Sequence, residues 1–161
     1  MILNIVILGL VTLERLAELL VSGRNTRRLL EQGAREHGRG HYGLIVAVHV
    51  LWLAALWWLA LPRPIDGFWL ALFVLLELFR VWVLVTLGRR WTTRIIVLPD
   101  APLVESGPYR FFNHPNYWVV IGEVAALPLV FDLWRVALVF SFLNAAVLTV
   151  RIRTENAALG R

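Results

Sequence analysis

Long apolar blocks separated by arginine-bearing connections constrain the fold of this chain more than any other feature. Five blocks reach or approach the roughly 20 residues that a helix needs to cross a bilayer. They cover residues 2–21, 42–61, 68–87, 117–131 and 134–150. Apolar residues make up 59% of the chain, above the roughly 45–50% that is usual in soluble domains. We therefore predict an all-α integral membrane protein with about five transmembrane helices.

Length and composition further restrict the class of protein to which this chain can belong. A chain of 161 residues supports one domain, so we expect a single transmembrane domain over residues 1–161. The absence of cysteine excludes disulfides, thiolate nucleophiles and cysteine-bound zinc, and we expect no metal site. The net charge of +5 comes from arginine alone, placed between apolar blocks. This pattern indicates membrane topology, and we do not expect nucleic acid as a partner.

The arginines orient the predicted helices. Twelve flank the blocks on one side, whereas only Arg63 and Arg135 lie in the opposite turns. The twelve are Arg24, Arg27, Arg28, Arg35, Arg39, Arg89, Arg90, Arg94, Arg110, Arg151, Arg153 and Arg161. By the positive-inside rule this side faces the cytoplasm. We expect an inner-membrane protein with its N-terminus outside and its C-terminus in the cytoplasm, where long loops form a cofactor pocket.

Six ionisable residues interrupt the apolar blocks. They are Glu14, Arg15, Glu18, Glu77, Arg80 and Glu123. Each costs about 2.5–3.5 kcal/mol if it faces lipid unpaired, so we expect all six to face the bundle interior and to pair. Arg15 with Glu18, and Glu77 with Arg80, have a spacing that allows pairing within one helix. A purely structural role and a role in a polar cavity both remain open.

The segment Gly88–Tyr117, between the third and fourth blocks, is too polar to cross a membrane. Gly107-Pro108 predicts a tight turn, and Pro115 prevents a regular helix from running through Asn113 and His114. The apolar run over residues 95–98 predicts a short strand or a membrane-surface segment. Exposed backbone groups and the polar side chains of residues 109–117 indicate a pocket for a polar cofactor.

The string GPYRFFNHPNY at residues 107–117 resembles the GPYR-x-x-RHPxY signature of the isoprenylcysteine carboxyl methyltransferase family. An acidic residue follows it within the next block as Glu123, and RIRTENAAL at residues 151–159 resembles the closing RI-x-x-EE-x-x-L. The strings ERLAEL at residues 14–19 and WTTRIIVLP at residues 91–99 resemble the short bacterial branch. Asn113 replaces the usual arginine before His-Pro, and Asn156 replaces the second acid of the closing pair.

This resemblance implies S-adenosylmethionine as cofactor, held by the 107–117 loop and the fourth and fifth helices. The implied cofactor-binding residues are Tyr109, His114, Pro115, Asn116, Tyr117, Glu123, Arg151 and Glu155. Glu123 and Glu155 are expected near the cofactor ammonium, Arg151 near its carboxylate, and the rings of Tyr117 and Trp118 against its cationic or adenine groups. The implied catalytic residues are His114, Glu123 and Arg80, and the implied substrate-binding residues are Arg15, Glu18, Trp91 and Arg94.

The acceptor is expected to be a lipophilic molecule that enters from the bilayer. The bacterial branch implies O-methylation of a phenolic or pyrone lipid, and the family name implies a prenylcysteine-like carboxylate. The first alternative is N-methylation of a phospholipid head group. The others are a reductase of the sterol-reductase type, for which this chain has too few predicted helices, and a non-enzymatic membrane lipid carrier. The sequence leaves the oligomeric state open.

Overall fold

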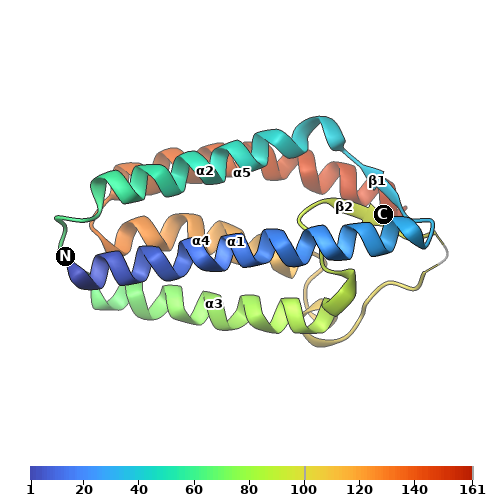
Figure 1. Cartoon of the computed structure of the whole chain (residues 1–161), viewed down its shortest axis with the longest axis horizontal. Helices are drawn as coiled ribbons and strands as arrows, with labels where there is room; N and C mark the ends of the chain where they lie inside the picture. The colour runs from blue at the N-terminus through green and yellow to red at the C-terminus, as the bar shows by residue number, and fades with distance from the viewer. Residues whose placement is uncertain (100, 161) are drawn as a thin grey trace.

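A computed structural model describes residues 1–99 and 101–160. The helices and strands are α1 (Ile2–Glu31), β1 (Arg35–His37), α2 (Arg39–Leu59), α3 (Gly67–Leu87), η1 (Gly88–Arg90), β2 (Ile95–Val97), η2 (Gly107–Arg110), α4 (Pro115–Val130) and α5 (Trp134–Leu159). The five α-helices lie along one axis, and β1 and β2 lie at the end opposite the N-terminus (Figure 1). We call this end, which holds β1, η1, β2 and η2, the loop end.

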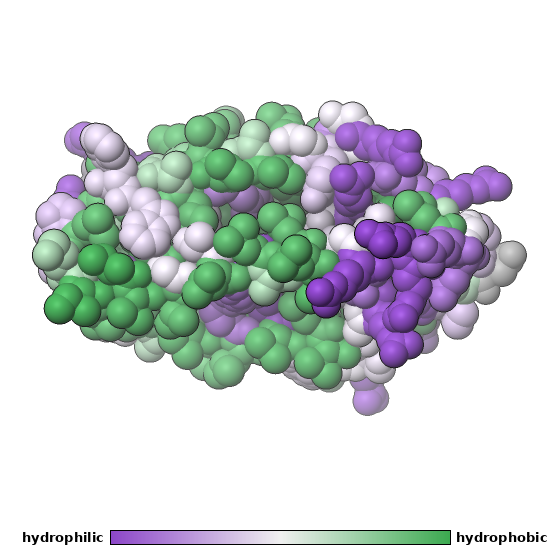
Figure 2. Space-filling model, in the orientation of Figure 1, coloured by the Kyte–Doolittle hydropathy of each residue, from purple (hydrophilic) through white to green (hydrophobic). Residues whose placement is uncertain are grey.

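The helices carry the apolar surface expected of a membrane protein. Three of them, over Arg39–Leu59, Gly67–Arg90 and Trp134–Leu159, are long and apolar enough to cross a membrane, and α4 is a shorter apolar helix. Figure 2 shows hydrophobic side chains over most of the bundle and hydrophilic ones gathered at the loop end. The prediction of long apolar helices is thus confirmed for three of the five blocks, and the count of five transmembrane helices stays a prediction.

Two helices extend well past the apolar blocks that predicted them. The first block ends at residue 21, but α1 continues to Glu31; the last ends at residue 150, but α5 continues to Leu159. An apolar block marks the part of a helix that contacts lipid, whereas polar residues such as arginine and glutamate extend a helix equally well. Arg161, one of the twelve arginines used to predict the orientation, lies outside the described residues.

A short pair of strands at the loop end accompanies the predicted helices. β1 and β2 form an antiparallel pair in which Glu36 is opposite Ile96. The sequence favoured a strand or a surface segment at residues 95–98, and the strand is observed at Ile95–Val97. Its partner β1, with the sequence REH, has no apolar pattern by which a strand is recognised. The pair joins the α1–α2 connection to the α3–α4 connection.

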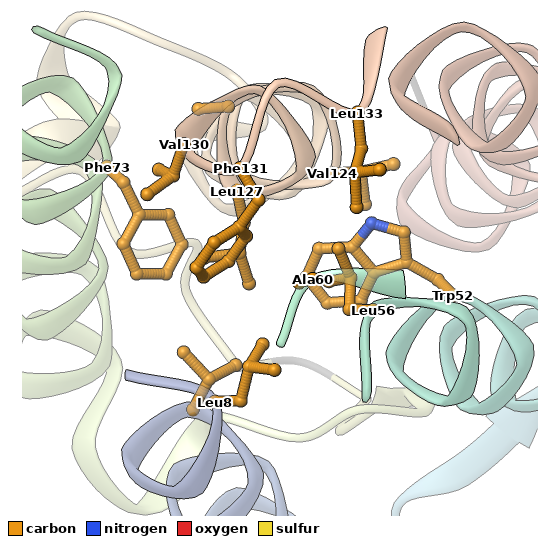
Figure 3. Packing of buried hydrophobic residues seen from close by; sticks show 12 residues of the cluster. Leu8, Trp52, Leu56, Ala60, Phe73, Val124, Leu127, Val130, Phe131 and Leu133 are labelled. Atoms are coloured by element: carbon orange, nitrogen blue, oxygen red, sulfur yellow. The ribbon is translucent and has the colours of Figure 1, made fainter. Parts of the chain in front are cut away.

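Tight apolar packing holds the helices together in the half of the bundle away from the loop end. Leu8, Trp52, Phe73, Leu127 and Phe131 are buried there in one cluster between α1, α2, α3 and α4 (Figure 3). Polar groups close the same end of the bundle. The amide of Asn4 donates to the carbonyls of Ala60 and Arg63, at 2.8 Å each. This packing leaves the loop half of the bundle to hold cavities and charges.

Candidate functional site

A cavity of about 190 Å³ lies at the loop end, between β2, η2, the start of α4 and the last turns of α5. We call it the loop cavity. Its polar and aromatic lining residues are Arg90, Trp91, Thr92, Arg94, Tyr109, Asn113, His114, Asn116, Tyr117, Arg151 and Glu155. The side-chain oxygen of Asn116 is buried without a hydrogen-bond partner among the described residues. Burial raises the pKa of the Tyr109 phenol, with the nearby Glu155 carboxylate adding to the effect.

A hydrogen-bonded network fixes one wall of the loop cavity. The Tyr117 hydroxyl donates to Glu155, and Nε of Arg151 donates to the same hydroxyl at 2.9 Å. Nε2 of His114 donates to the side-chain oxygen of Asn156 at 2.9 Å, while the His114 ring stacks on that of Tyr117. Pro115 begins α4, so His114 stands just before the helix and Tyr117 in its first turn. The network therefore joins the start of α4 to the end of α5.

A second cavity, of about 230 Å³, lies between the inner faces of α1 and α2 and reaches α4 and α5. We call it the helix groove. Its wall is mostly apolar, with Leu16, Leu19 and Val50 also exposed on the outer surface of the bundle. The groove therefore opens sideways, toward the lipid that surrounds such helices. Figure 2 shows hydrophilic side chains in recesses of this otherwise apolar surface.

The charged residues of the helices form one cluster beside the helix groove. Arg80 donates to Glu123 through Nε at 2.6 Å and to Glu18 at 2.7 Å. Arg15 donates to Glu18 at 2.8 Å, to Glu123 at 3.0 Å and to Glu77 at 3.3 Å. The prediction of inward-facing pairs is confirmed for these five residues, whereas Glu14 forms no ion pair with the described residues. Most of the pairs join different helices, and the expected Glu77–Arg80 pair within α3 is long, at 3.8 Å.

The loop cavity and the helix groove share part of their walls. Trp91, Asn116, Tyr117 and Arg151 line both. The indole N–H of Trp91, like the side-chain oxygen of Asn116, is buried and has no partner among the described residues. A polar molecule in the loop cavity and an apolar molecule in the helix groove would thus both contact these four residues. Such proximity suits group transfer between a water-soluble donor and a lipid.

Most of the predicted site residues line one of these two cavities. Six of the expected cofactor-binding residues line the loop cavity, namely Tyr109, His114, Asn116, Tyr117, Arg151 and Glu155. Of the expected substrate-binding residues, Arg15, Glu18 and Trp91 line the helix groove and Arg94 lines the loop cavity. Arg80, expected to be catalytic, also lines the groove.

Three residues that were expected to contact the cofactor line neither cavity. Glu123 is 2% exposed and lies under Arg80 and Arg15, so its carboxylate does not line the loop cavity. Pro115 is buried at the start of α4 and lines neither cavity. Trp118 is 61% exposed and points away from both, because its neighbour Tyr117 occupies the inward face of the first helical turn.

Some residues at the site were not predicted. Asn156, recognised only as a departure from the motif, is the hydrogen-bond partner of His114. Asn25 donates to the carbonyls of Gly88 and Trp91, at 3.2 and 2.8 Å, and so holds Trp91 in place. His49, within the second apolar block, lines the helix groove. A lone histidine in an apolar block is a usable signal, since ionisable residues inside membranes are rare.

Comparisons with known proteins match the part of the chain that contains most of these site residues. Residues 69–161 match the isoprenylcysteine carboxyl methyltransferase (ICMT) family. The uncharacterized protein YpbQ of Bacillus subtilis is 36% identical over 158 residues, which cover 95% of this chain and 94% of the relative. An uncharacterized protein of Haemophilus influenzae is 28% identical over 153 residues, covering 90% and 88% of the two chains. No solved structure matches the chain.

The family match covers more than half of the chain. It includes the motif at residues 107–117, the shared wall of the two cavities and the closing motif on α5. The YpbQ match extends the similarity over the first two helices, which form the other side of the helix groove. The chain therefore belongs to the isoprenylcysteine carboxyl methyltransferase family, whose members are membrane methyltransferases that use S-adenosylmethionine.

Proposed function

We propose that this protein transfers a methyl group from S-adenosylmethionine to a hydroxyl of a membrane lipid of the phenol or pyrone type. The observation that carries the proposal is the meeting of two unlike cavities at Trp91, Asn116, Tyr117 and Arg151. One cavity is polar and lies among the loops; the other is apolar and opens toward lipid. A carrier for a single lipid would need only the second.

The residues of the loop cavity fit S-adenosylmethionine. Glu155 is suited to the ammonium of its amino-acid part and Arg151 to the carboxylate. The rings of Tyr117 and Tyr109 suit the sulfonium and adenine parts, because aromatic faces attract cations and stack on bases. The unpartnered oxygen of Asn116 is an acceptor for an amino or hydroxyl group. When bound, the cofactor supplies a methyl group on a positively charged sulfur.

The chain's own contribution is to position groups and to exclude water. The Tyr117 hydroxyl is held between Arg151 and Glu155, which fixes its ring at the shared wall. His114 is held by Asn156 and stacked on Tyr117, so it braces the same ring. Alignment of an acceptor oxygen with a methyl group in such a site supplies much of the rate of a displacement reaction.

The charges beside the helix groove favour an acceptor without a negative charge. Arg15 and Arg80 are both occupied by carboxylates of Glu18, Glu77 and Glu123. Neither guanidinium is left to hold a carboxylate head group. A phenol or enol fits this surface better than a prenylcysteine-like carboxylate does. The excess of carboxylates in the cluster supports an amine acceptor as the second candidate.

The positions of the arginines support one orientation of the protein in the membrane. Arg24, Arg27, Arg28, Arg89 and Arg90 lie toward the loop end of their helices. We propose that the loop end faces the cytoplasm, where S-adenosylmethionine is available. The N-terminus then lies on the other side of the membrane.

The test is a methyl-transfer assay with an unbiased acceptor. Purified protein is incubated with isotopically labelled S-adenosylmethionine and a total bacterial lipid extract, and labelled products are identified by mass spectrometry. We expect a labelled methyl ether of a long-chain phenol or pyrone. A labelled methyl ester or methylamine would replace the acceptor proposed above, and no labelled lipid with any extract would reject the methyltransferase proposal.

A variant pair ties the activity to the site. His114→Ala should lower methyl transfer by a factor of about 100 or more, in the range typical of positioned groups, while the protein stays folded in detergent. Trp118→Phe, one position beyond Tyr117 but on the outer surface, should leave turnover within about twofold. Equal activities of the two variants would show that His114 does not contribute to methyl transfer.

A further inference from the structure

One face of α2 forms the apolar side of the helix groove. Tyr42, Ile45, Val46, His49 and Leu53 all line it, and their spacing places them on a single side of the helix. Four of these positions are apolar or aromatic, as expected for a surface against a hydrocarbon chain. His49 is the exception, and it lies in the middle of the row.

The hydrogen bonds of His49 leave one ring nitrogen unused. Its Nδ1 donates to the carbonyl of Ile45 at 2.8 Å, one turn earlier in α2. In the neutral ring this places the proton on Nδ1 and a lone pair on Nε2. The structure gives Nε2 no partner among the residues that it describes. The ring is only half-buried, so Nε2 remains accessible to a molecule in the groove.

Other polar groups along the same groove are already occupied. The Thr12 hydroxyl donates to the carbonyl of Leu8 and accepts from Nε1 of Trp57. The Tyr42 hydroxyl is paired with Thr93 at 3.0 Å. None of these groups is left to bind a molecule in the groove.

Each charged lining residue also has at least one hydrogen-bond partner. Glu18 accepts from both Arg15 and Arg80, and Nε of Arg151 is engaged by Tyr117. The unpartnered buried donors among the lining residues are Nε of Arg15 and Nε1 of Trp52 and of Trp91. On the α2 face of the groove, the accessible atom without a partner is therefore an acceptor, Nε2 of His49, which calls for a donor on the molecule that binds there.

We propose that His49 selects the lipid acceptor: its Nε2 accepts a hydrogen bond from a hydroxyl of a neutral, single-chain lipid whose hydrocarbon tail lies along the Ile45–Leu53 face of α2. The proposal rests on the methyltransferase function proposed above and names a specificity-determining residue for it. An anionic lipid is disfavoured near His49, because Arg15 and Arg80 are already paired with carboxylates. A lipid of the same length without a donor hydroxyl leaves Nε2 unsatisfied in a low-dielectric groove, which costs affinity.

The test uses two probes that differ only in their donors. They are a long-chain alkylresorcinol and its dimethyl ether with the same chain, titrated by calorimetry into the purified protein in detergent micelles without cofactor. We expect the unmodified protein to bind the resorcinol about three- to tenfold more tightly, the effect of one hydrogen bond. Equal affinities for the two probes would overturn the proposal directly, before any variant is made.

Three variants assign the preference to His49. His49→Leu should remove the preference for the resorcinol and leave binding of the dimethyl ether unchanged. His49→Gln, which retains an acceptor, should keep part of the preference. Leu51→Ala, on the exposed side of α2, should behave like the unmodified protein. A His49→Leu protein that keeps the preference, or that loses both probes equally, contradicts the proposal; the second result indicates a structural role.

Kinetics separate this proposal from the function on which it rests. If a hydroxylated lipid is methylated, His49→Leu should raise its KM with a smaller change in kcat, because the lost contact is to the bound lipid. The affinity for S-adenosylmethionine should not change. Failure of all methyl transfer would reject the proposed function, whereas the probe preference and its loss in His49→Leu would still test the role of His49.

Discussion

The hydrogen bond from His114 Nε2 to the side-chain oxygen of Asn156 spans 2.9 Å and ties the start of α4 to the last turns of α5. Asn156 is one of the two positions at which this chain departs from the family pattern. An amide oxygen only accepts, so the bond keeps the ring proton on Nε2 and turns Nδ1 toward Glu155, at 3.8 Å. His114 thus has a neutral partner at the position where the family pattern has an acid.

Asn156→Ala should weaken S-adenosylmethionine binding by about three- to tenfold, because one hydrogen bond that orients His114 is lost. Calorimetric titration of the cofactor into purified protein measures the change. Thr154→Ala is the matched control on the same helix, since its hydroxyl bonds only to the carbonyl of Val150 on the exposed side. An unchanged Kd in Asn156→Ala would show that His114 is positioned without this bond.

Glu123→Leu should lower the free energy of unfolding by about 3–5 kcal/mol, because it leaves the guanidinium of Arg80 buried with its main partner removed. Arg80 is 4% exposed, so water cannot replace the lost carboxylate. Denaturant titration in mixed micelles, followed by circular dichroism, measures the loss.

The double variant Arg80→Met with Glu123→Leu distinguishes pairing from general packing. Removing both charges should restore part of the stability that Glu123→Leu loses, since the fully buried guanidinium of Arg80 is no longer left without its main partner. Additive losses in the double variant would show that the two side chains contribute independently of their ion pair.

The helices and the inward-facing charges were predictable because both follow from local rules. A block of apolar residues identifies a helix in lipid, and the cost of an unpaired charge there predicts that Glu123 faces inward. The partners of Glu123 were not predictable, because they depend on how α1, α3 and α4 are arranged in space. The roles of Asn156 and His49 depend on the same arrangement, and strand β1 depends on a partner distant in the sequence.

Asn25→Asp should loosen the segment that carries Trp91. The Asn25 amide donates to the carbonyls of Gly88 and Trp91, and an aspartate would place a carboxylate against the same two oxygens. We expect faster amide exchange over residues 88–97, measured by hydrogen–deuterium exchange with mass spectrometry. Thr26→Ser, at the neighbouring position of α1, serves as control. Unchanged protection in Asn25→Asp would mean that other contacts hold Trp91.

We expect low pH to weaken the pairing of β1 with β2 at the loop end. The Glu36 side chain is 4% exposed and accepts hydrogen bonds from Arg94 and Arg39, at 2.8 Å each. Burial alone would raise the pKa of Glu36, but the two hydrogen bonds and the charges of these arginines outweigh it and lower the pKa. The stabilisation is therefore present above the unfolded pKa of about 4.3 and is lost as the pH falls through the lower pKa of the folded protein.

Hydrogen exchange of β1 and β2 between roughly pH 6 and pH 3, corrected for intrinsic exchange rates, measures this loss. We expect protection of residues 35–37 and 95–97 to decline in the acidic part of that range. Glu36→Gln cannot titrate, so its protection should be lower at pH 6 and should depend less on pH. Arg94 also lies over the Tyr42 ring at 4.5 Å, a contact that acid does not remove. Protection that stays constant down to pH 3 would therefore assign the strand pairing to such contacts and not to Glu36.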